Sequence, residues 1–339
     1  MILSVDQLNA QIATHLTEHS PDQVVVVTSQ SVNFHCLHLL YHLETFDVIQ
    51  IPDGENCKTI EVAQSIWSQF SNLNITRKSI IVALGGGSVL DITGFCAATF
   101  MRGIHVVYIP TTLLALVDSA EGGKNGLNFG NIKNLIGTFN QPNLILNSFE
   151  FIKTLPKIEL LSGWAEIVKH GILEGQFIWE NIQTGIPELE HPIWPTLIEH
   201  NIRFKQSVVA KDFKETGERK LLNLGHTIGH ALEALNIDNP EINHGICVAN
   251  GILIEAEISK SLNLANQTFV EHLNSLIWKE FPKIPFSKDE IPALIQLIKA
   301  DKKNNHNQLN FTLPVDIGQV HFDVPVDENI IFNTLMNWN

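Results

Sequence analysis

Residues 80–91 read Ile-Ile-Val-Ala-Leu-Gly-Gly-Gly-Ser-Val-Leu-Asp, an apolar run that ends in three consecutive glycines. A short apolar run without polar alternation is typical of a strand buried on both faces of a parallel sheet. The glycines would turn the chain from this strand into a helix, where backbone amides can approach a phosphate. Because the spacing differs from the usual G-x-G-x-x-G dinucleotide motif, a tight structural turn remains the alternative interpretation.

Similar apolar runs alternate with helical patterns through the first half of the chain. We predict strands at Gln23–Thr28, Phe46–Ile51, Ser79–Leu84, His105–Pro110 and Asn143–Leu146, with helices at Thr59–Leu73 and Val89–Phe100. This alternation predicts a doubly wound, Rossmann-like α/β domain over residues 1–150. Asp53-Gly54-Glu55 and Pro110-Thr111-Thr112 follow two further strands, so polar groups at one edge of the sheet favour a nucleotide site.

The second half, residues 151–339, has a different pattern and predicts a mainly α-helical domain. We expect helices at Leu161–Leu173, Pro195–Lys211, Leu221–Leu235, Ile246–Leu262, Gln267–Lys279 and Asp289–Lys303. Only Gln308–Phe322 is strand-like, and it predicts a hairpin that turns near residues 315–318.

Residues 222–233 of this half read Leu-Asn-Leu-Gly-His-Thr-Ile-Gly-His-Ala-Leu-Glu, and His244-Gly245 follows after a loop. His226 and His230 are four apart, so on a helix they share one face. Imidazoles are zinc ligands, and a catalytic zinc site uses three protein ligands and keeps one position open. A histidine pair can also be part of a buried core, but the third histidine favours a metal site.

Glu166 and Lys169 are three residues apart in an otherwise apolar helical stretch, Leu161–Gly171. On a surface such a pair would be a weak ion pair. The neighbouring Trp164, Ile167 and Val168 predict burial instead, and a buried carboxylate needs a cation or a metal. Glu166 is therefore a further candidate metal ligand.

The chain is acidic, with a formal net charge of −14, which argues against nucleic acid or an anionic membrane as a partner. Against this background we interpret the basic residues near the motifs as a possible pocket for a multiply anionic substrate. Solvated surface side chains are the alternative for each of them. The residues are Arg102, Lys124, Lys133, Lys169, Lys205, Arg219, Lys302 and Lys303.

The sequence also indicates the cellular compartment. No run approaches the ~18 apolar residues of a membrane span, and the first residues lack the basic and apolar regions of a signal peptide. Four cysteines without C-x-x-C spacing suggest reduced thiols. We expect a cytoplasmic protein.

Taken in order, these motifs resemble those of the 3-dehydroquinate synthase family, within the sugar-phosphate cyclase superfamily. The resemblance runs from about Asp53 to Gly318. It is carried by Asp-Gly-Glu-x-x-Lys, Gly-Gly-Gly-x-x-x-Asp, Arg-Gly, Pro-Thr-Thr-Leu-Leu-Ala, Asp-Ser with Gly-Gly-Lys, Lys-Asn, Ala-Glu-x-x-Lys, Arg-x-x-Leu-Asn-x-Gly-His-Thr-x-Gly-His, His-Gly and Asp-Lys-Lys. None of these is specific alone, but the ordered set is.

The resemblance implies an NAD-binding N-terminal domain, a metal-binding C-terminal domain and a homodimer. Glu166, His226 and His244 would bind zinc or cobalt, which leaves His230 to face the substrate. NAD would be lined by Asp53, Gly54, Glu55, Lys58, Gly86, Gly87, Ser88, Asp91, Thr111, Thr112, Asp118, Lys124, Lys133, Phe151 and Thr154. The substrate would be held by Arg102, Asp118, Lys124, Asn134, Lys169, Lys205, Arg219, Asn223, His230 and Lys303, with Arg102 reaching the partner's site.

Three residues depart from the family pattern. Glu121 stands where a small aliphatic residue is usual, Asn147 replaces an aspartate, and Ile246 replaces a glutamate. None of them is one of the implied ligands, so the departures bear on fine tuning and on the exact substrate.

The implied activity converts 3-deoxy-D-arabino-heptulosonate 7-phosphate to 3-dehydroquinate and phosphate, in the shikimate pathway of aromatic amino acid biosynthesis. It proceeds by transient oxidation with NAD, elimination of phosphate, re-reduction and intramolecular aldol closure. Three alternatives remain at the level of sequence: another cyclase of the valiolone or inosose type, a metal-dependent NAD alcohol dehydrogenase, and a non-catalytic nucleotide-binding descendant.

Overall fold

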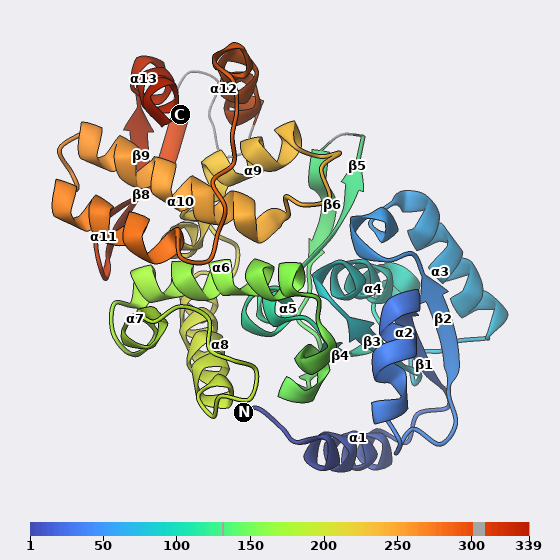
Figure 1. Cartoon of the computed structure of the whole chain (residues 1–339). Helices are drawn as coiled ribbons and strands as arrows, with labels where there is room; N and C mark the ends of the chain where they lie inside the picture. Colours follow the sequence, from blue (N-terminus) through green and yellow to red (C-terminus); the bar gives the residue numbers. More distant parts are fainter. Residues whose placement is uncertain (131, 301–308, 339) are drawn as a thin grey trace. The chain divides into compact units, whose positions relative to one another are not determined.

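The computed structural model describes residues 1–130, 132–300 and 309–338 (Figure 1). The chain divides into two compact units: unit 1 is Met1–Pro156 with Trp194–Ile202, and unit 2 is Lys157–Ile193 with Arg203–Asn339. Within the described residues, no helix combines the length and apolar character that crossing a membrane requires.

Unit 1 is built on a five-stranded parallel sheet with the order β2-β1-β3-β4-β7. The strands are β1 Val24–Ser29, β2 Asp47–Ile51, β3 Ile80–Gly85, β4 His105–Pro110 and β7 Leu144–Ile145. All five predicted strands are confirmed. β2 lies on one side of β1, and β3, β4 and β7 lie on the other, so the strand order reverses between β1 and β3. Ligands of such sheets bind at this point, beyond the carboxyl ends of the strands.

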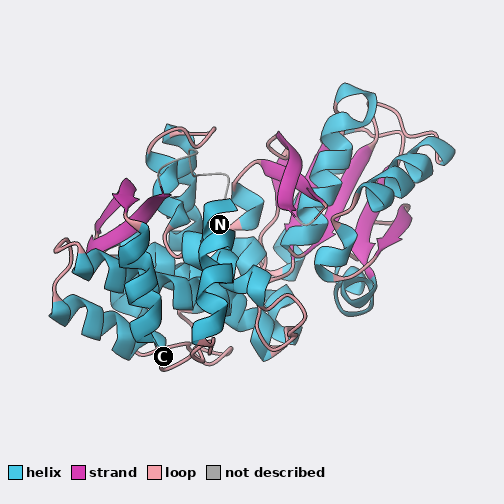
Figure 2. Ribbon diagram, turned by 90° about the horizontal axis from the view of Figure 1, so that it is seen from above, coloured by secondary structure: helices cyan, strands magenta, loops and turns pink. Residues whose placement is uncertain are grey.

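The two faces of the sheet carry separate apolar cores, because neighbouring residues of a strand point to opposite faces. Val25 and Val27 of β1 pack into a core that includes buried residues of α3 Ile60–Asn72 and α4 Gly87–Thr99. Val24 and Val26 pack into a second core with α1 Val5–His19 and α2 Gln30–Cys36. Helices therefore cover both faces of this sheet (Figure 2).

An antiparallel hairpin of unit 1 has no counterpart among the predicted elements. It consists of β5 Lys124–Phe129 and β6 Ile132–Phe139, paired through Lys124 with Phe139 and Gly126 with Gly137. The glycines and asparagines of these strands suggest a loop, and β6 is largely exposed. The short helix α5 Leu113–Val117 precedes the hairpin, and η5 Phe149–Thr154 follows β7.

Unit 2 is mainly helical. Its helices are α6 Lys157–Glu174, α7 Phe177–Ile182, α9 His226–Leu235, α10 His244–Ser261, α11 Gln267–Ile277, α12 Ile291–Ala300 and α13 Glu328–Trp338, and α8 Trp194–Lys211 enters it at Arg203. The predicted hairpin is confirmed as β8 Leu309–Asp316 and β9 Gln319–Val326, with Gly318 at φ +75° in its turn.

Helix α10 is the centre of unit 2. It packs against α9, α6, α11, α13 and β8, and its side chains are buried on all sides. An all-round apolar helix is typical of the interior of a large domain. Its Gly251 lies so close to α9 that a Cβ there would be 2.0 Å from the carbonyl oxygen of Gly225.

The helix predicted at Leu221–Leu235 is wrong at its start. Residues Glu218–Asn223 form a 3₁₀ helix, η6, and α9 begins only at His226. Gly225 between them has φ +80°, a left-handed conformation that ends one helical segment and redirects the next. The break places His226 in the first turn of α9.

All four cysteines are buried, and none forms a disulfide. They are Cys36, Cys57 and Cys96 in unit 1 and Cys247 in unit 2.

Substitution of Gly94 by alanine should destabilise unit 1. The added Cβ would lie 1.9 Å from the hydroxyl oxygen of Tyr108, which donates a buried 2.7 Å hydrogen bond to Asn125. Overpacking of this kind costs roughly 1–3 kcal/mol, so thermal unfolding should begin several degrees lower. Gly217→Ala is the control, because its Cβ would meet nothing nearer than 3.7 Å. Equal melting temperatures for the two variants would contradict the packing described here.

Candidate metal centre and nucleotide edge

Three side chains of unit 2 converge in one place: Glu166 of α6, His226 in the first turn of α9 and His244 in the first turn of α10. The Nε2 atoms of His226 and His244 lie 3.5 Å and 3.8 Å from Oε1 of Glu166. These separations are long for hydrogen bonds. They are close to the ~3.4 Å between two ligands that each bind a tetrahedral metal ion at about 2.1 Å.

The second nitrogen of each histidine is held by another group. His226 Nδ1 lies 3.1 Å from the carbonyl oxygen of Leu224, and His244 Nδ1 lies 3.4 Å from Glu233 Oε2. A carbonyl or carboxylate at Nδ1 fixes a proton there and leaves the Nε2 lone pair for a metal. Both Nε2 atoms are the ones that face Glu166.

The Glu166 carboxylate is completely buried, and neither of its oxygens has a hydrogen-bond partner of standard geometry among the described residues. The Lys169 ammonium lies beside Oε2 as an ion pair. Burial raises the pKa of Glu166, but Lys169 and the two imidazoles outweigh it and hold that pKa well below its ordinary value. The group is therefore an ionised carboxylate in a buried position, a state in which it can bind a divalent cation.

The two histidines differ in protonation. Burial, followed by the neighbouring Lys169, lowers the pKa of His226 well below its ordinary value, so this ring is neutral. Burial lowers the pKa of His244 as well, but the neighbouring carboxylates of Glu166 and Glu233 outweigh this and raise it to about 10. Without a metal, the proton on His244 supplies part of the positive charge between the two carboxylates. The donor set of one carboxylate and two imidazoles fits zinc or a similar divalent metal.

Close glycine contacts bring the three ligands together. A Cβ on Gly245, next to His244, would lie 2.4 Å from the Cα of Ser162, one turn before Glu166 on α6. The Gly251 contact described above brings α10 equally close to the start of α9. The His-Gly and Gly-His motifs therefore have a packing reason as well as a chemical one.

Glu255 of α10 is a positioning residue that the sequence analysis did not identify. Its carboxylate is fully buried and accepts hydrogen bonds from the amides of Gly225, at 2.5 Å, and Ile228, at 3.3 Å. These amides flank the start of α9, where a carboxylate also interacts favourably with the helix dipole. Glu255 thus fixes the backbone that carries His226. Its position eleven residues after His244, within an apolar helix, gives little sequence signal.

His230 lies beside this centre but is not one of the converging ligands. Its ring centroid is 5.3 Å from that of His226 and 6.1 Å from that of His244, and its side chain is exposed. The side chains whose ligand atoms converge are therefore Glu166, His226 and His244, and His230 lies next to His226 without joining this group.

Basic groups of unit 2 surround the same helices. Lys169 is 1% exposed, Arg219 3% and Lys205 4%, which is unusual burial for such side chains. Arg219 and Asn223 belong to η6, which packs against α6, the helix of Glu166 and Lys169. Arg219 donates to the carbonyl oxygen of Phe213 at 2.6 Å, and Asn223 donates to Glu215 at 2.6 Å. Lys303 lies outside the described residues.

In unit 1, the predicted polar residues gather at the carboxyl ends of β2, β1, β3 and β4. Asp53 follows β2 and accepts hydrogen bonds from Ser31, just after β1. Thr111 follows β4, and its amide donates to the carbonyl oxygen of Gly85 at the end of β3. A single edge of the sheet therefore carries the polar turns.

The glycine turn at this edge is closely packed and opens a helix. A Cβ on Gly86 would lie 2.9 Å from Thr112, and one on Gly87 would lie 2.8 Å from Ser119. Neither glycine has a positive φ, so the absence of a side chain is required by space and not by backbone conformation. Gly86 caps α4 without any side-chain hydrogen bond. The first amides of α4 are thus placed as in phosphate-binding turns.

Lys58 connects three segments behind this turn. It is 3% exposed, and its ammonium forms a 2.6 Å ion pair with Asp91 of α4 and donates to Asn134 of β6. Burial lowers its pKa, but Asp91 and Glu55 outweigh this and raise it. Glu55 accepts hydrogen bonds from Ser88 at 2.8 Å and Asn128 at 3.0 Å.

The remaining predicted residues of unit 1 have varied environments. Lys124 and Lys133 are exposed on the β5–β6 hairpin, Asp118 is half-buried after α5, and Phe151 is buried in η5 while Thr154 is exposed. Arg102 is exposed in a turn where it and Met101 both have positive φ, at 67° and 50°. Arg77 holds this turn by two hydrogen bonds to the Met101 carbonyl, at 2.8 Å and 3.1 Å.

Two family models together match residues 48–304 of the chain. Residues 48–162 match the model of the 3-dehydroquinate synthase N-terminal region, and residues 163–304 match that of the C-terminal region. The chain belongs to the 3-dehydroquinate synthase family. Two 3-dehydroquinate synthases illustrate the relationship. That of Pyrococcus abyssi is 40% identical over 91% of each chain, and that of Pyrococcus furiosus is 39% identical over 94% of each.

Solved structures share the fold of this family. A 2-deoxy-scyllo-inosose synthase complexed with carbaglucose-6-phosphate, NAD⁺ and Co²⁺ has a TM-score of 0.85 at 22% identity, covering 97% of this chain and 94% of that one. A 2-epi-5-epi-valiolone synthase from Streptomyces hygroscopicus with NAD⁺ and Zn²⁺ has a TM-score of 0.80 at 21% identity, covering 93% and 90%. An iron-containing alcohol dehydrogenase from Corynebacterium glutamicum is more distant, with a TM-score of 0.63 at 16% identity, covering 99% and 93%.

The three residues that we expect to depart from the family pattern are all buried. Glu121 lies in η4 just before β5, Asn147 follows β7, and Ile246 lies in the first turn of α10. Ile246 is next but one to His244 and packs in the apolar interior of unit 2.

Removal of the Glu255 carboxylate should weaken metal binding without removing a ligand. In Glu255→Ala the amides at the start of α9 lose their acceptor, so His226 is no longer fixed. Loss of such an indirect partner costs roughly 10–100-fold in metal affinity. Competition with a chromophoric zinc chelator measures the change. Glu257→Gln on the same helix is the control, because Glu257 forms an ion pair with Lys260 and, among the described residues, none with the start of α9. Unchanged zinc affinity in Glu255→Ala would mean that α9 is held by packing alone.

Proposed function

We propose that the protein is an NAD- and divalent-metal-dependent 3-dehydroquinate synthase, a lyase that converts 3-deoxy-D-arabino-heptulosonate 7-phosphate to 3-dehydroquinate and phosphate. The observation that carries the proposal is the convergence of Glu166, His226 and His244 around one point, with Lys169 beside it. Relatives about 40% identical over nine tenths of the chain are 3-dehydroquinate synthases, which supports this substrate.

Glu166, His226 and His244 would hold the metal, zinc or cobalt in our proposal. The polar edge of unit 1 would hold NAD, with the pyrophosphate at the start of α4 near Gly86, Gly87 and Ser88. Thr112 and Asp53 would face the remaining parts of the dinucleotide. Solved relatives of the same fold contain NAD⁺ with Co²⁺ or Zn²⁺, in support of both cofactors.

When bound, the metal would orient and acidify the substrate hydroxyls, and NAD would accept and return a hydride within each turnover. The chain itself supplies charge and position. Lys169 sits in a dry environment where an ammonium binds an anion strongly. Lys205 and Arg219 would add to the positive potential that holds the carboxylate and phosphate of the substrate.

Lys169 would also bind the phosphate of the substrate. In the metal-free protein its ammonium neutralises Glu166, so a divalent cation that binds Glu166 leaves Lys169 without its full counter-charge. The phosphate of the substrate would then supply it. His230, exposed beside the ligands, is suited to contact the substrate and to exchange a proton with it.

We further propose a cytoplasmic homodimer in which Arg102 acts on the site of the partner subunit. Arg102 lies exposed in a strained turn that Arg77 holds in place. Strain of this kind persists where a side chain must be presented in one direction.

The proposed activity has a direct assay. Purified protein with NAD and zinc should release phosphate from the heptulosonate phosphate and form dehydroquinate, with no net accumulation of NADH. A chelator should abolish turnover, and Zn²⁺ or Co²⁺ should restore it. Net NADH production would instead indicate an alcohol dehydrogenase, and turnover of a hexose or heptulose phosphate lacking the carboxylate would indicate an inosose or valiolone cyclase. Either result would refute the proposal.

Mixing two inactive variants tests the role of Arg102. Arg102→Ala and Lys169→Ala should each lose turnover, and Lys169→Ala should still bind zinc. In a mixed dimer, one site would combine an intact Lys169 with the partner subunit's Arg102. Random reassociation should therefore restore roughly a quarter of the wild-type activity, since half of the dimers are mixed and each has one complete site. No recovery, with dimer exchange verified, would place Arg102 in its own subunit's site.

A further inference from the structure

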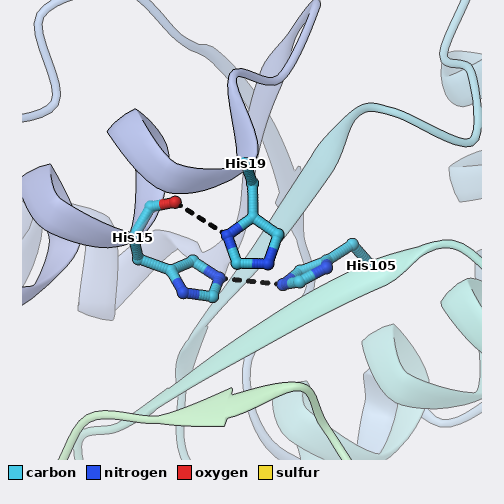
Figure 3. Close-up of side chains that lie close together, drawn as sticks. All are labelled: His15, His19 and His105. Carbon is cyan, nitrogen blue, oxygen red and sulfur yellow. Dashed lines mark hydrogen bonds between the residues drawn. The ribbon is translucent and has the colours of Figure 1, made fainter.

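Three histidines of unit 1 form a cluster that the proposed reaction does not use. His15 and His19 are one turn apart on α1, and His105 is the first residue of β4 (Figure 3). The polar turns proposed for NAD follow the carboxyl end of β4, whereas His105 is at its amino end. We call His15, His19 and His105 the trihistidine cluster.

The three rings gather around one point. Their centroids are 4.2, 4.9 and 4.7 Å apart, and each ring offers one nitrogen such that all three lie within 4.8 Å of one another. Nε2 of His15 is 2.8 Å from Nε2 of His105. Nδ1 of His19 is 2.9 Å from the carbonyl oxygen of His15, which leaves its other nitrogen facing the remaining two rings (Figure 3).

The protonation state of the cluster is compatible with cation binding. Burial, then the neighbouring His19, lowers the pKa of His15. Burial, then His15 and His19, lowers the pKa of His105 to about 4. Both rings are therefore neutral at pH 7, the state in which imidazole binds metal. The Glu18 carboxylate, next to His19 on α1, adds negative charge near His15.

The surroundings favour coordination by imidazole with solvent completing the shell. His15 and His105 are partly buried and thus held in position, while His19 is exposed and its ring is held through Nδ1 by the His15 carbonyl oxygen. A helix that carries histidines four residues apart presents both on one face. Nitrogen ligands of this kind suit zinc, nickel, copper and cobalt, and not calcium or magnesium.

We propose that the trihistidine cluster is a second metal site, which binds one divalent late transition metal ion through His15, His19 and His105 and ties α1 to β4. Binding requires His15 and His105 to separate by about half an ångström and His19 to swing inward, so that the three nitrogens are about 3.4 Å apart. His15 and His105 are 90 residues apart in sequence. An ion bound to both would therefore cross-link distant parts of unit 1.

Zinc stoichiometry tests the proposal independently of the proposed function. The variant Glu166→Gln/His244→Ala removes two ligands of the unit 2 centre. Equilibrium dialysis against zinc at pH 7.5 should still find one ion per chain. Adding His105→Ala or His19→Ala should weaken this remaining site by roughly tenfold or more, since even indirect partners of a ligand are worth that much. His19→Ala is the variant of least risk to folding, because its side chain is exposed.

His35→Ala is the matched control, since His35 is an exposed histidine of the neighbouring α2. It should leave zinc binding unchanged. In the otherwise wild-type chain, His19→Ala should lower zinc content by one ion and abolish the rise in melting temperature that micromolar zinc gives to unit 1. Turnover should be unaffected. The proposal would be overturned if His19→Ala and His105→Ala left the zinc content of the Glu166→Gln/His244→Ala variant unchanged. The three rings would then form only a hydrogen-bonded stack.

Discussion

A single buried carboxylate governs the architecture of unit 2. Glu166 has no contact with water, so its charge must be met by groups that the fold delivers from elsewhere. Lys169 comes from the same helix, and His226 and His244 come from the first turns of two others. Two further features serve this convergence. They are the close glycine contacts between α6, α9 and α10, and the Glu255 carboxylate that accepts hydrogen bonds from the start of α9. Together they bring the starts of α9 and α10 close to the middle of α6, where the three side chains could bind one cation.

Unit 1 meets a similar demand by different means. Its charged residues stand at strand ends, where backbone amides and short side chains are available, and Lys58 neutralises two carboxylates behind the glycine turn. The polar groups of unit 1 thus lie along a sheet edge, where we propose that NAD binds, and those of unit 2 converge on the point where we propose that the metal binds. Each unit is internally complete in this respect, and each carries its own part of the chemistry that we propose.

Much of this could be predicted from sequence because the signals are local. The buried strands are continuous apolar runs, and the ordered motifs identify the family, since each keeps its residues at fixed spacing. The β5–β6 hairpin was missed because glycine and asparagine suit loops as well as exposed strands. The break at Gly225 was missed because the helical pattern continues through it, although glycine at this position adopts a left-handed conformation. Glu255 and the trihistidine cluster depend on tertiary contacts, and nothing in the spacing of His15 and His105 relates them.

The state of the four cysteines has a practical consequence. Burial raises the pKa of Cys36 to about 11 and that of Cys57 to about 12, and it raises that of Cys96 still further above the ordinary value. A thiol that keeps its proton is a poor nucleophile and a poor ligand. The four natural cysteines are buried and should not react with thiol reagents while the protein remains folded. A single cysteine introduced on the surface could therefore be labelled selectively with a fluorophore or a spin label.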